Sequence, residues 1–153
     1  MANTYTQLYV HIVFATKGRQ SLIPKQHKEE IHKYITGIVR NRKQKLIAVH
    51  CMPDHTHLFV GFKPTITIAD LVRDVKTASS SFIKEKKITP FHFSWQEGYG
   101  AFTHSHAQLS TVASYIENQE THHQRKSFKE EYLIFLDEFA VEYDDRYLFD
   151  FLD

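Results

Sequence analysis

The chain of 153 residues carries a formal net charge of +1, with 42% hydrophobic and 24% charged residues. These values fit one globular domain of ordinary size and exclude a disordered or strongly basic chain. The single cysteine, Cys51, excludes an intrachain disulfide, and the sequence shows no leader-like or membrane-spanning apolar run, so we expect a cytoplasmic protein with no membrane partner.

The first 62 residues predict three strands and one helix. Residues 5–16 alternate between two faces with a period of two, which is typical of a strand. Apolar residues then recur at helical spacing, which predicts a helix burying Ile31, Tyr34, Ile35, Ile38 and Val39. Residues 45–51 and 55–62 predict two more strands, and the short connection Met52-Pro53-Asp54 between them favours antiparallel neighbours.

The following residues predict a helix, a fourth strand and two more helices. The segment Thr67-Ile68-Ala69-Asp70 is typical of a capped helix start, and the helix after it has an apolar stripe of Ile68, Leu71, Val72, Val75 and Phe82. A fourth strand is expected at residues 99–103. We expect Ser110 to cap a helix that runs to about His123, and a last amphipathic helix to bury Phe128, Tyr132, Phe135, Leu136 and Phe139.

This order, β-α-β-β-α-β followed by helices, predicts an α+β fold, a ferredoxin-like antiparallel sheet with additional C-terminal helices. We expect residues 1–153 to form a single domain, in which residues 124–153 are a C-terminal helical tail. Two crossover helices should cover one face of the sheet. The other face should be free to hold a site or a partner, and a site there should close only when the helix of Tyr115 docks on the sheet, from the same subunit or its partner.

Two histidines, His55 and His57, lie two residues apart on the third predicted strand. Residues i and i+2 of a strand point to the same face, so both imidazoles project side by side. Two imidazoles in this relation can bind one divalent metal ion. His50 and Asp54 lie near the pair and could orient an imidazole, although Asp54 fits a turn equally well. The alternative is a chance pair of histidines on a surface strand.

Tyr115 and Gln119 lie four residues apart on a predicted helix and therefore share a face. A tyrosine hydroxyl can act as a nucleophile, but with a free pKa of about 10 it is weak until it is assisted. A metal ion that neutralises a phosphate would lower the barrier to attack. The side-chain oxygen of Gln119 could be a third metal ligand. Alternatively, Tyr115 is a core residue whose hydroxyl has an ordinary partner.

Other histidines compete for the metal-binding role. His104 and His106 form a second His-x-His pair at an expected strand end, where the geometry is less regular. His122 and His123 end the predicted helix of Tyr115, where a cationic imidazole interacts favourably with the helix dipole. We interpret both pairs as surface or DNA-facing residues.

Basic residues on the exposed side of the second predicted helix are candidates for binding DNA. The candidate residues are Arg73, Lys76, Ser80 and Lys84. Lysine and arginine can follow a phosphate backbone, and serine can add hydrogen bonds. Because the net charge is only +1, affinity for DNA must come from such local charge. The alternative is an ordinary solvated helix face.

Several segments together resemble the small single-tyrosine HUH transposases of the insertion-sequence type. The segment Met52-Pro53-Asp54-His55-Thr56-His57-Leu58-Phe59-Val60 resembles their HUH motif, and Tyr115-Ile116-Glu117-Asn118-Gln119 resembles their nucleophile helix. Between them, Trp95-Gln96 and Gly98-Tyr99-Gly100-Ala101-Phe102 are also similar. The tail from Phe128 to Phe149 is similar to that of bacterial members, including relatives associated with repetitive extragenic palindromes.

The resemblance implies a DNA transposase in which His55, His57 and Gln119 bind Mg²⁺ or Mn²⁺ and Tyr115 is the nucleophile. Such an enzyme binds DNA hairpins at element ends and cleaves single-stranded DNA, which leaves a 5′-phosphotyrosine and a free 3′-hydroxyl for later rejoining. The resemblance also implies a homodimer, in which the tyrosine of one subunit can serve the histidines of the other, and no nucleotide cofactor.

Two other functions fit the same residues. The chain could be a catalytically inactive or host-retained DNA-hairpin-binding protein, since a fold does not fix a function. It could also be another HUH nuclease, such as a replication or relaxation initiator. The short chain and the lack of a Gly-x-x-x-x-Gly-Lys-Ser/Thr phosphate loop argue against a large initiator but allow a small nickase.

Overall fold

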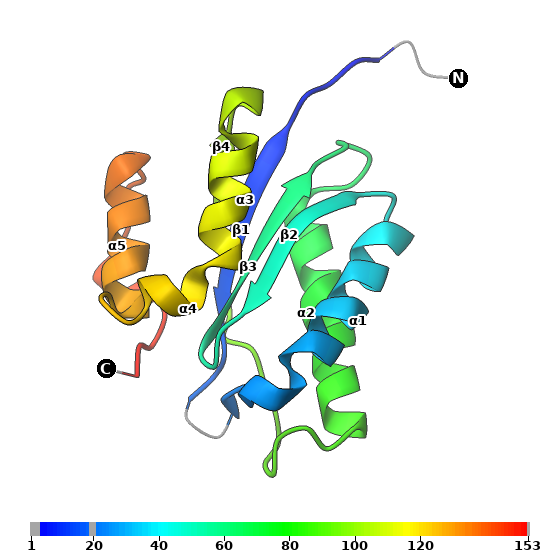
Figure 1. The fold of residues 1–153 in the computed structure, drawn as a ribbon, viewed down its shortest axis with the longest axis vertical. Coiled ribbons are helices and arrows are strands. Elements are labelled where there is room, and N and C mark those ends of the chain that lie inside the picture. Colours follow the sequence, from blue (N-terminus) through cyan, green and yellow to red (C-terminus); the bar gives the residue numbers. More distant parts are fainter. Residues whose placement is uncertain (1–3, 19–20, 153) are drawn as a thin grey trace.

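The computed structural model describes residues 4–18 and 21–152. Its centre is an antiparallel four-stranded sheet in the order β2-β3-β1-β4 (Figure 1). The strands are β1 (Tyr9–Ala15), β2 (Lys45–Cys51), β3 (His55–Gly61) and β4 (Gly100–His104). This order and the crossovers between strands confirm the ferredoxin-like α+β fold that the sequence predicts.

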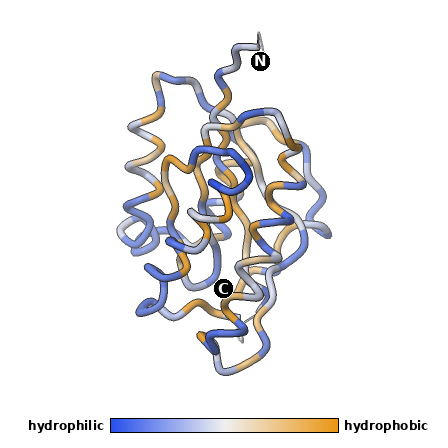
Figure 2. Tube along the Cα trace, turned by 90° about the vertical axis from the view of Figure 1, so that its right-hand side faces the viewer, coloured by the Kyte–Doolittle hydropathy of each residue, from blue (hydrophilic) through white to orange (hydrophobic). Residues whose placement is uncertain are grey.

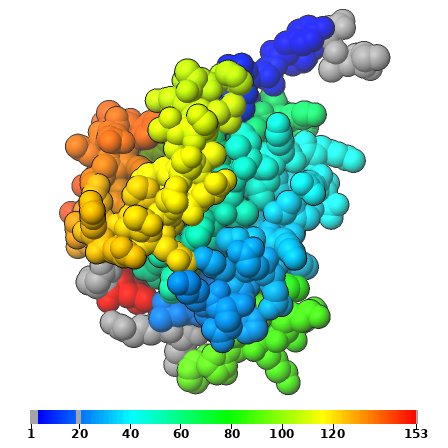
Figure 3. All heavy atoms as spheres, viewed as in Figure 1, coloured from blue at the N-terminus to red at the C-terminus, as the bar shows by residue number. Residues whose placement is uncertain are grey.

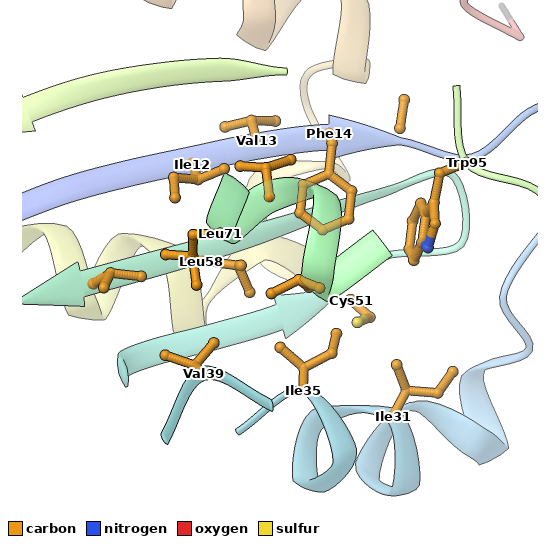
Figure 4. Packing of buried hydrophobic residues seen from close by; sticks show 14 of the residues in the cluster. Ile12, Val13, Phe14, Ile31, Ile35, Val39, Cys51, Leu58, Leu71 and Trp95 are labelled. Atoms are coloured by element: carbon orange, nitrogen blue, oxygen red, sulfur yellow. The ribbon is translucent and has the colours of Figure 1, made fainter. Parts of the chain in front are cut away.

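Two helices, α1 (Lys28–Asn41) and α2 (Ile68–Glu85), cover one face of the sheet, and the short 3-10 helix η2 (Lys25–His27) precedes α1 (Figure 1). As predicted, α2 starts at a cap, because the Thr67 hydroxyl oxygen accepts a hydrogen bond from the backbone N–H of Asp70 at 3.0 Å. Between this face and the helices lies the main core, where Figure 4 shows Ile12, Phe14 and Leu58 close together.

Three further helices, α3 (Leu109–Glu117), α4 (Gln119–His122) and α5 (Phe128–Glu138), cover the opposite face of the sheet (Figures 1 and 3). The face that the sequence left free for a site or a partner is therefore covered by helices of the same chain. Val112 and Ile116 of α3 pack against Ala48 and Phe59, which project from β2 and β3. β2 and β3 therefore carry apolar residues on this second face as well, so covering that face removes more apolar surface from water.

Some element boundaries differ from those expected. β1 begins at Tyr9, four residues later than the alternation suggested. Ser110 is not a helix cap, because the chain already turns at Ser105, whose backbone N–H donates to Gln108 Oε1 at 3.2 Å, and the 3-10 helix η3 (His106–Gln108) leads into α3. The helix also breaks at Asn118, with φ −101° and ψ 27°, so the expected continuous helix is two helices.

Hydrophobic residues follow the central strands, while the surrounding helices alternate between hydrophobic and hydrophilic residues (Figure 2). The 3-10 helix η4 (Asp145–Tyr147) lies in the C-terminal segment after α5. Within residues 4–18 and 21–152, every helix is too short or too polar to span a bilayer.

Candidate active site

His55 and His57 lie side by side on β3, underneath the helices of the second face. Their ring centroids are 5.0 Å apart, and the residues are 1% and 0% exposed. The shared face follows from the period of the strand, as predicted. Their burial follows from the cover of α3–α5, so the reading of the pair as surface histidines is wrong.

Both imidazoles use Nδ1 for an outer contact and direct Nε2 into the cluster. His55 Nδ1 donates to Asp54 Oδ1 at 2.7 Å, and His57 Nδ1 lies 2.7 Å from His11 Nε2. Asp54 thus orients an imidazole in addition to forming the turn. Such outer partners are typical of histidines that bind metal ions. Within the described part of the chain, the buried Nε2 of His57 makes no hydrogen bond.

Glu131 of α5 is a central residue of the cluster that the sequence reasoning missed. It is 2% exposed, and its Oε1 lies 3.2 Å from Nε2 of both His57 and His123 and 3.6 Å from His55 Nε2. Burial alone would raise the pKa of this carboxyl group, but the neighbouring His57 and His123 hold it well below its usual range. A buried, ionised carboxylate therefore faces three imidazoles.

His123, which follows α4, also belongs to the cluster, so its expected place on the surface is wrong. Its side chain is 10% exposed, and its Nδ1 donates to the Lys126 carbonyl at 2.8 Å. Its Nε2 lies 2.9 Å from Gln119 Oε1 as well as close to Glu131. Burial alone would lower the pKa of His123, but the hydrogen bond to Glu131 and its charge raise it. His123 can therefore act as the cation of the metal-free cluster.

Tyr115 and Gln119 reach the same carboxylate from α3 and α4. The Tyr115 hydroxyl donates to Glu131 Oε2, and Gln119 Nε2 donates to that oxygen at 3.0 Å. Gln119 is fully buried, and its Oε1 lies 3.3 Å from His55 Nε2. Burial, followed by the charge of Glu131, raises the pKa of the Tyr115 hydroxyl far above its usual value. Within one chain, the structure thus brings all four predicted site residues together.

The remaining candidate histidines lie outside this cluster. His104 ends β4 and contacts Gln108, whereas His106 is exposed. His122 stacks on the Tyr115 ring at a centroid distance of 4.3 Å. His50 is buried on β2, with its Nε2 3.9 Å from Glu120.

The predicted DNA-binding residues all lie on α2, across the sheet from the histidine cluster (Figure 1). They are Arg73, Lys76, Ser80 and Lys84. Lys76 ties α2 to the following loop, because its Nζ donates to the carbonyls of Gln96 and Gly98 at 2.8 and 2.6 Å. Arg73 pairs with Asp70 at 3.1 Å. Contact of these residues with DNA stays a prediction.

Comparisons with known proteins agree with this architecture. Residues 4–119 match the family model of IS200-like transposases. The chain is 25% identical over 118 residues to the ISDra2 transposase TnpA of Deinococcus radiodurans, a match that covers 74% of this chain and 84% of that protein. It is similar to the crystal structure of a protein from D. radiodurans R1 assigned as a transposase, with a TM-score of 0.59 and 27% identity over 78% of this chain and 95% of that one.

A second solved structure shares the fold at lower sequence identity. A REP-associated tyrosine transposase bound to a REP hairpin has a TM-score of 0.59 and 14% identity, over 80% of this chain and 73% of that chain. The family match ends at residue 119, so His123 and Glu131 lie beyond it.

Proposed function

The chain belongs to the family of IS200-like transposases, and on that premise we propose that it cleaves and rejoins single-stranded DNA through Tyr115, with a divalent metal ion at His55 and His57. One observation carries the proposal: the Tyr115 hydroxyl and both imidazoles meet at the carboxylate of Glu131. A possible nucleophile and a possible phosphate-activating centre are therefore neighbours within one chain.

In the proposed cleavage step, the hydroxyl oxygen of Tyr115 attacks the phosphorus of the scissile phosphate. The bond from phosphorus to Tyr115 forms, and the bond from phosphorus to the 3′ oxygen breaks. The proton of the Tyr115 hydroxyl passes to solvent, and the departing 3′ oxygen gains a proton from solvent. In rejoining, the 3′-hydroxyl attacks the phosphotyrosine and Tyr115 recovers a proton, so no nucleotide cofactor is needed.

The residues present fit a metal ion. His57 Nε2 is buried without a hydrogen bond in the described part of the chain, and the outer contacts of both histidines leave Nε2 as the nitrogen that faces the cluster. Gln119 Oε1 lies next to His55 Nε2 and can serve as a further ligand. When bound, Mg²⁺ or Mn²⁺ would neutralise the charge on the scissile phosphate and lower the barrier to attack.

We propose DNA hairpins as the partner, supported by the REP hairpin in the fold neighbour. Arg73, Lys76, Ser80 and Lys84 would then contact DNA away from the cleavage point, because α2 lies across the sheet from Tyr115. The proposed homodimer would bind paired element ends. It is not needed to assemble the site, because Tyr115 reaches the histidine cluster of its own chain.

The test is formation of a covalent adduct with single-stranded DNA that carries the element end, in Mg²⁺ or Mn²⁺. We expect an adduct that disappears in Tyr115→Phe and persists in Tyr147→Phe, since Tyr147 is 81% exposed and lies outside the cluster. An adduct that survives Tyr115→Phe would refute the assigned nucleophile.

One observation favours a second function, that of a hairpin-binding protein without activity. His55, His57 and Glu131 are at most 2% exposed, so a DNA phosphate reaches them only when α5 moves away from the sheet. A chain whose α5 stays docked would bind hairpins but leave them uncut. Hairpin binding without an adduct, in every divalent metal tried, would establish this second function.

A further inference from the structure

We propose that His123 and Glu131 complete a metal centre of three imidazoles and one carboxylate, which selects a transition-metal ion over Mg²⁺. The proposal rests on the proposed function for the location of the site. Both residues come after residue 119, where the family match ends, so the C-terminal part of this chain supplies half of the donors.

The three histidines are oriented in the same way. The Nδ1 atoms of His55, His57 and His123 contact a carboxylate, an imidazole and a backbone carbonyl, respectively. Each Nε2 therefore points inward, where Glu131 Oε1 lies 3.2 to 3.6 Å from all three nitrogens. Outer contacts of this kind fix the ring orientation of metal-binding histidines.

The four donor atoms lie within 4.8 Å of one another. Two ligands that are each about 2.1 Å from one ion are at most about 4.2 Å apart, so small side-chain shifts would bring this set into range. The buried Nε2 of His57 makes no hydrogen bond among the described residues, and its contact with Glu131 Oε1 at 3.2 Å is an ion pair only when His57 is protonated. A buried nitrogen without a hydrogen bond is costly, and a metal ion would give it a partner.

The chemistry of the donors determines which ion they prefer. Imidazole nitrogen suits ions such as Zn²⁺ and Co²⁺, whereas Mg²⁺ prefers oxygen ligands and retains several waters. The cluster is nearly closed to solvent, since Glu131 and the histidines of β3 are at most 2% exposed. Such a site disfavours a strongly hydrated ion. We expect affinity to increase from Mg²⁺ to Mn²⁺ to Co²⁺.

The experiment is titration of the chelator-treated full chain with Mg²⁺, Mn²⁺ and Co²⁺, in the absence of DNA. Binding is followed by the unfolding temperature and, for Co²⁺, by the visible absorption spectrum. Co²⁺ should raise the unfolding temperature at concentrations where Mg²⁺ has no effect. His123→Gln and Glu131→Gln should each weaken Co²⁺ binding by about 10-fold or more. The exposed His92→Gln is the matched control and should bind like the wild type.

Equal affinity for Mg²⁺ and Co²⁺, or wild-type Co²⁺ binding in folded His123→Gln and Glu131→Gln, would overturn the proposal. Co²⁺ binding through these residues without any DNA adduct would leave it intact and refute the proposed function instead. An adduct formed with Mg²⁺ at the wild-type rate in both variants would support the proposed function and refute a metal centre that includes His123 and Glu131. Circular dichroism shows which variants are folded.

A different contact points to His11 as the positioning residue for His57. His11 of β1 is 2% exposed, and its ring stacks on that of His57 at a centroid distance of 4.9 Å. The outer partners of the other two histidines are oxygens that only accept, but His11 Nε2 can donate or accept. His57 can bind a metal ion through Nε2 only when its proton is on Nδ1, and His11 Nε2 must then accept that proton's hydrogen bond.

Two substitutions test whether His11 fixes this tautomer. His11→Gln offers another acceptor and should retain metal binding, whereas His11→Phe keeps a ring without an acceptor and should weaken it by about 10- to 100-fold. The ¹⁵N chemical shifts of the His57 ring should show its proton moving off Nδ1 in His11→Phe. Wild-type affinity and an unchanged His57 tautomer in folded His11→Phe would overturn the assignment.

Discussion

Replacing Glu131 with alanine should destabilise the metal-free protein by about 3–5 kcal/mol, the range found when one partner of a buried ion pair is removed. The carboxylate accepts hydrogen bonds from Tyr115 and Gln119 and pairs with His57 and His123. A hydrogen bond to a charged group contributes about 1.5–3 kcal/mol. Desolvation of the buried carboxylate opposes these hydrogen bonds and ion pairs, so the net decrease in the free energy of unfolding falls in the range of about 3–5 kcal/mol.

The assay is urea and thermal unfolding in the presence of a chelator at pH 7. For a domain of this size, each kcal/mol lowers the midpoint temperature by about 2–4 °C, so we expect a decrease of about 6–20 °C for Glu131→Ala. Glu138→Ala is the matched control, because Glu138 is an exposed acid of α5 without a hydrogen bond or ion pair among residues 4–18 and 21–152. A loss below about 1 kcal/mol, which is typical of ordinary surface changes, would refute the reasoning.

The effect of Glu131→Ala on the free energy of unfolding should depend on pH. The folded-state pKa of Glu131 lies below its unfolded value of about 4.3. Ionisation of Glu131 therefore contributes its full stability above that unfolded pKa, and this contribution decreases as the pH falls towards the folded pKa. The difference in unfolding free energy between wild type and Glu131→Ala should thus be complete near pH 6 and narrow below about pH 4. A difference that stays unchanged down to pH 3 would contradict this assignment.

Three further changes have defined outcomes. Ile116→Ala removes a fully buried side chain of α3 and should lower the free energy of unfolding, measured in urea, by about 2–5 kcal/mol. It should also lower the adduct yield of Tyr115, which lies on the same helix, and an unchanged yield would contradict this coupling. Lys76→Met leaves two loop carbonyls without their donor and should lower the free energy of unfolding by about 1–3 kcal/mol. Lys84→Met, the exposed control, should change this free energy little. Co²⁺ at 100 times its Kd should raise the unfolding free energy of the wild type by about 2.7 kcal/mol, and His55→Ala should abolish this increase.

The sheet was predictable because local patterns determine it. The turn at residues 52–54 makes β2 and β3 antiparallel neighbours, and the capping oxygen of Thr67 fixes the start of α2. His55 and His57 share a face through strand geometry alone, whatever covers that face. These features depend on residues close together in the sequence.

The cover of the second face depends on contacts between distant segments, so local patterns did not predict it. A signal was nevertheless present, because Val13 and Phe59 are apolar on that face, and strands that are apolar on both faces are usually covered on both. The position of Glu131 in the sequence also indicated that this residue is buried. It lies three residues after Phe128 and four before Phe135, which puts a carboxylate on the apolar stripe of a helix.

The place of His123 could not be predicted, because it depends on where the helix breaks. A continuous helix from Tyr115 would determine the direction of every later side chain by its period. The break at Asn118 changes that direction, and it leaves His122 against the Tyr115 ring while His123 enters the cluster. Short-range sequence patterns rarely determine such a break within one or two residues.

The four proposed metal donors differ in how firmly the fold holds them. His55 and His57 belong to a central strand, whereas Glu131 belongs to α5, on the outside of the molecule (Figure 1). Four protein donors make a closed site, while catalytic sites keep one position for substrate. A DNA phosphate carries negative charge like Glu131 and would compete with it for the same nitrogens and for the Tyr115 hydroxyl. We therefore expect substrate to replace Glu131 rather than a histidine, and amide hydrogen exchange should become faster in α5 than in β3 when DNA binds. If the amides of α5 are equally protected with and without DNA, substrate does not replace Glu131.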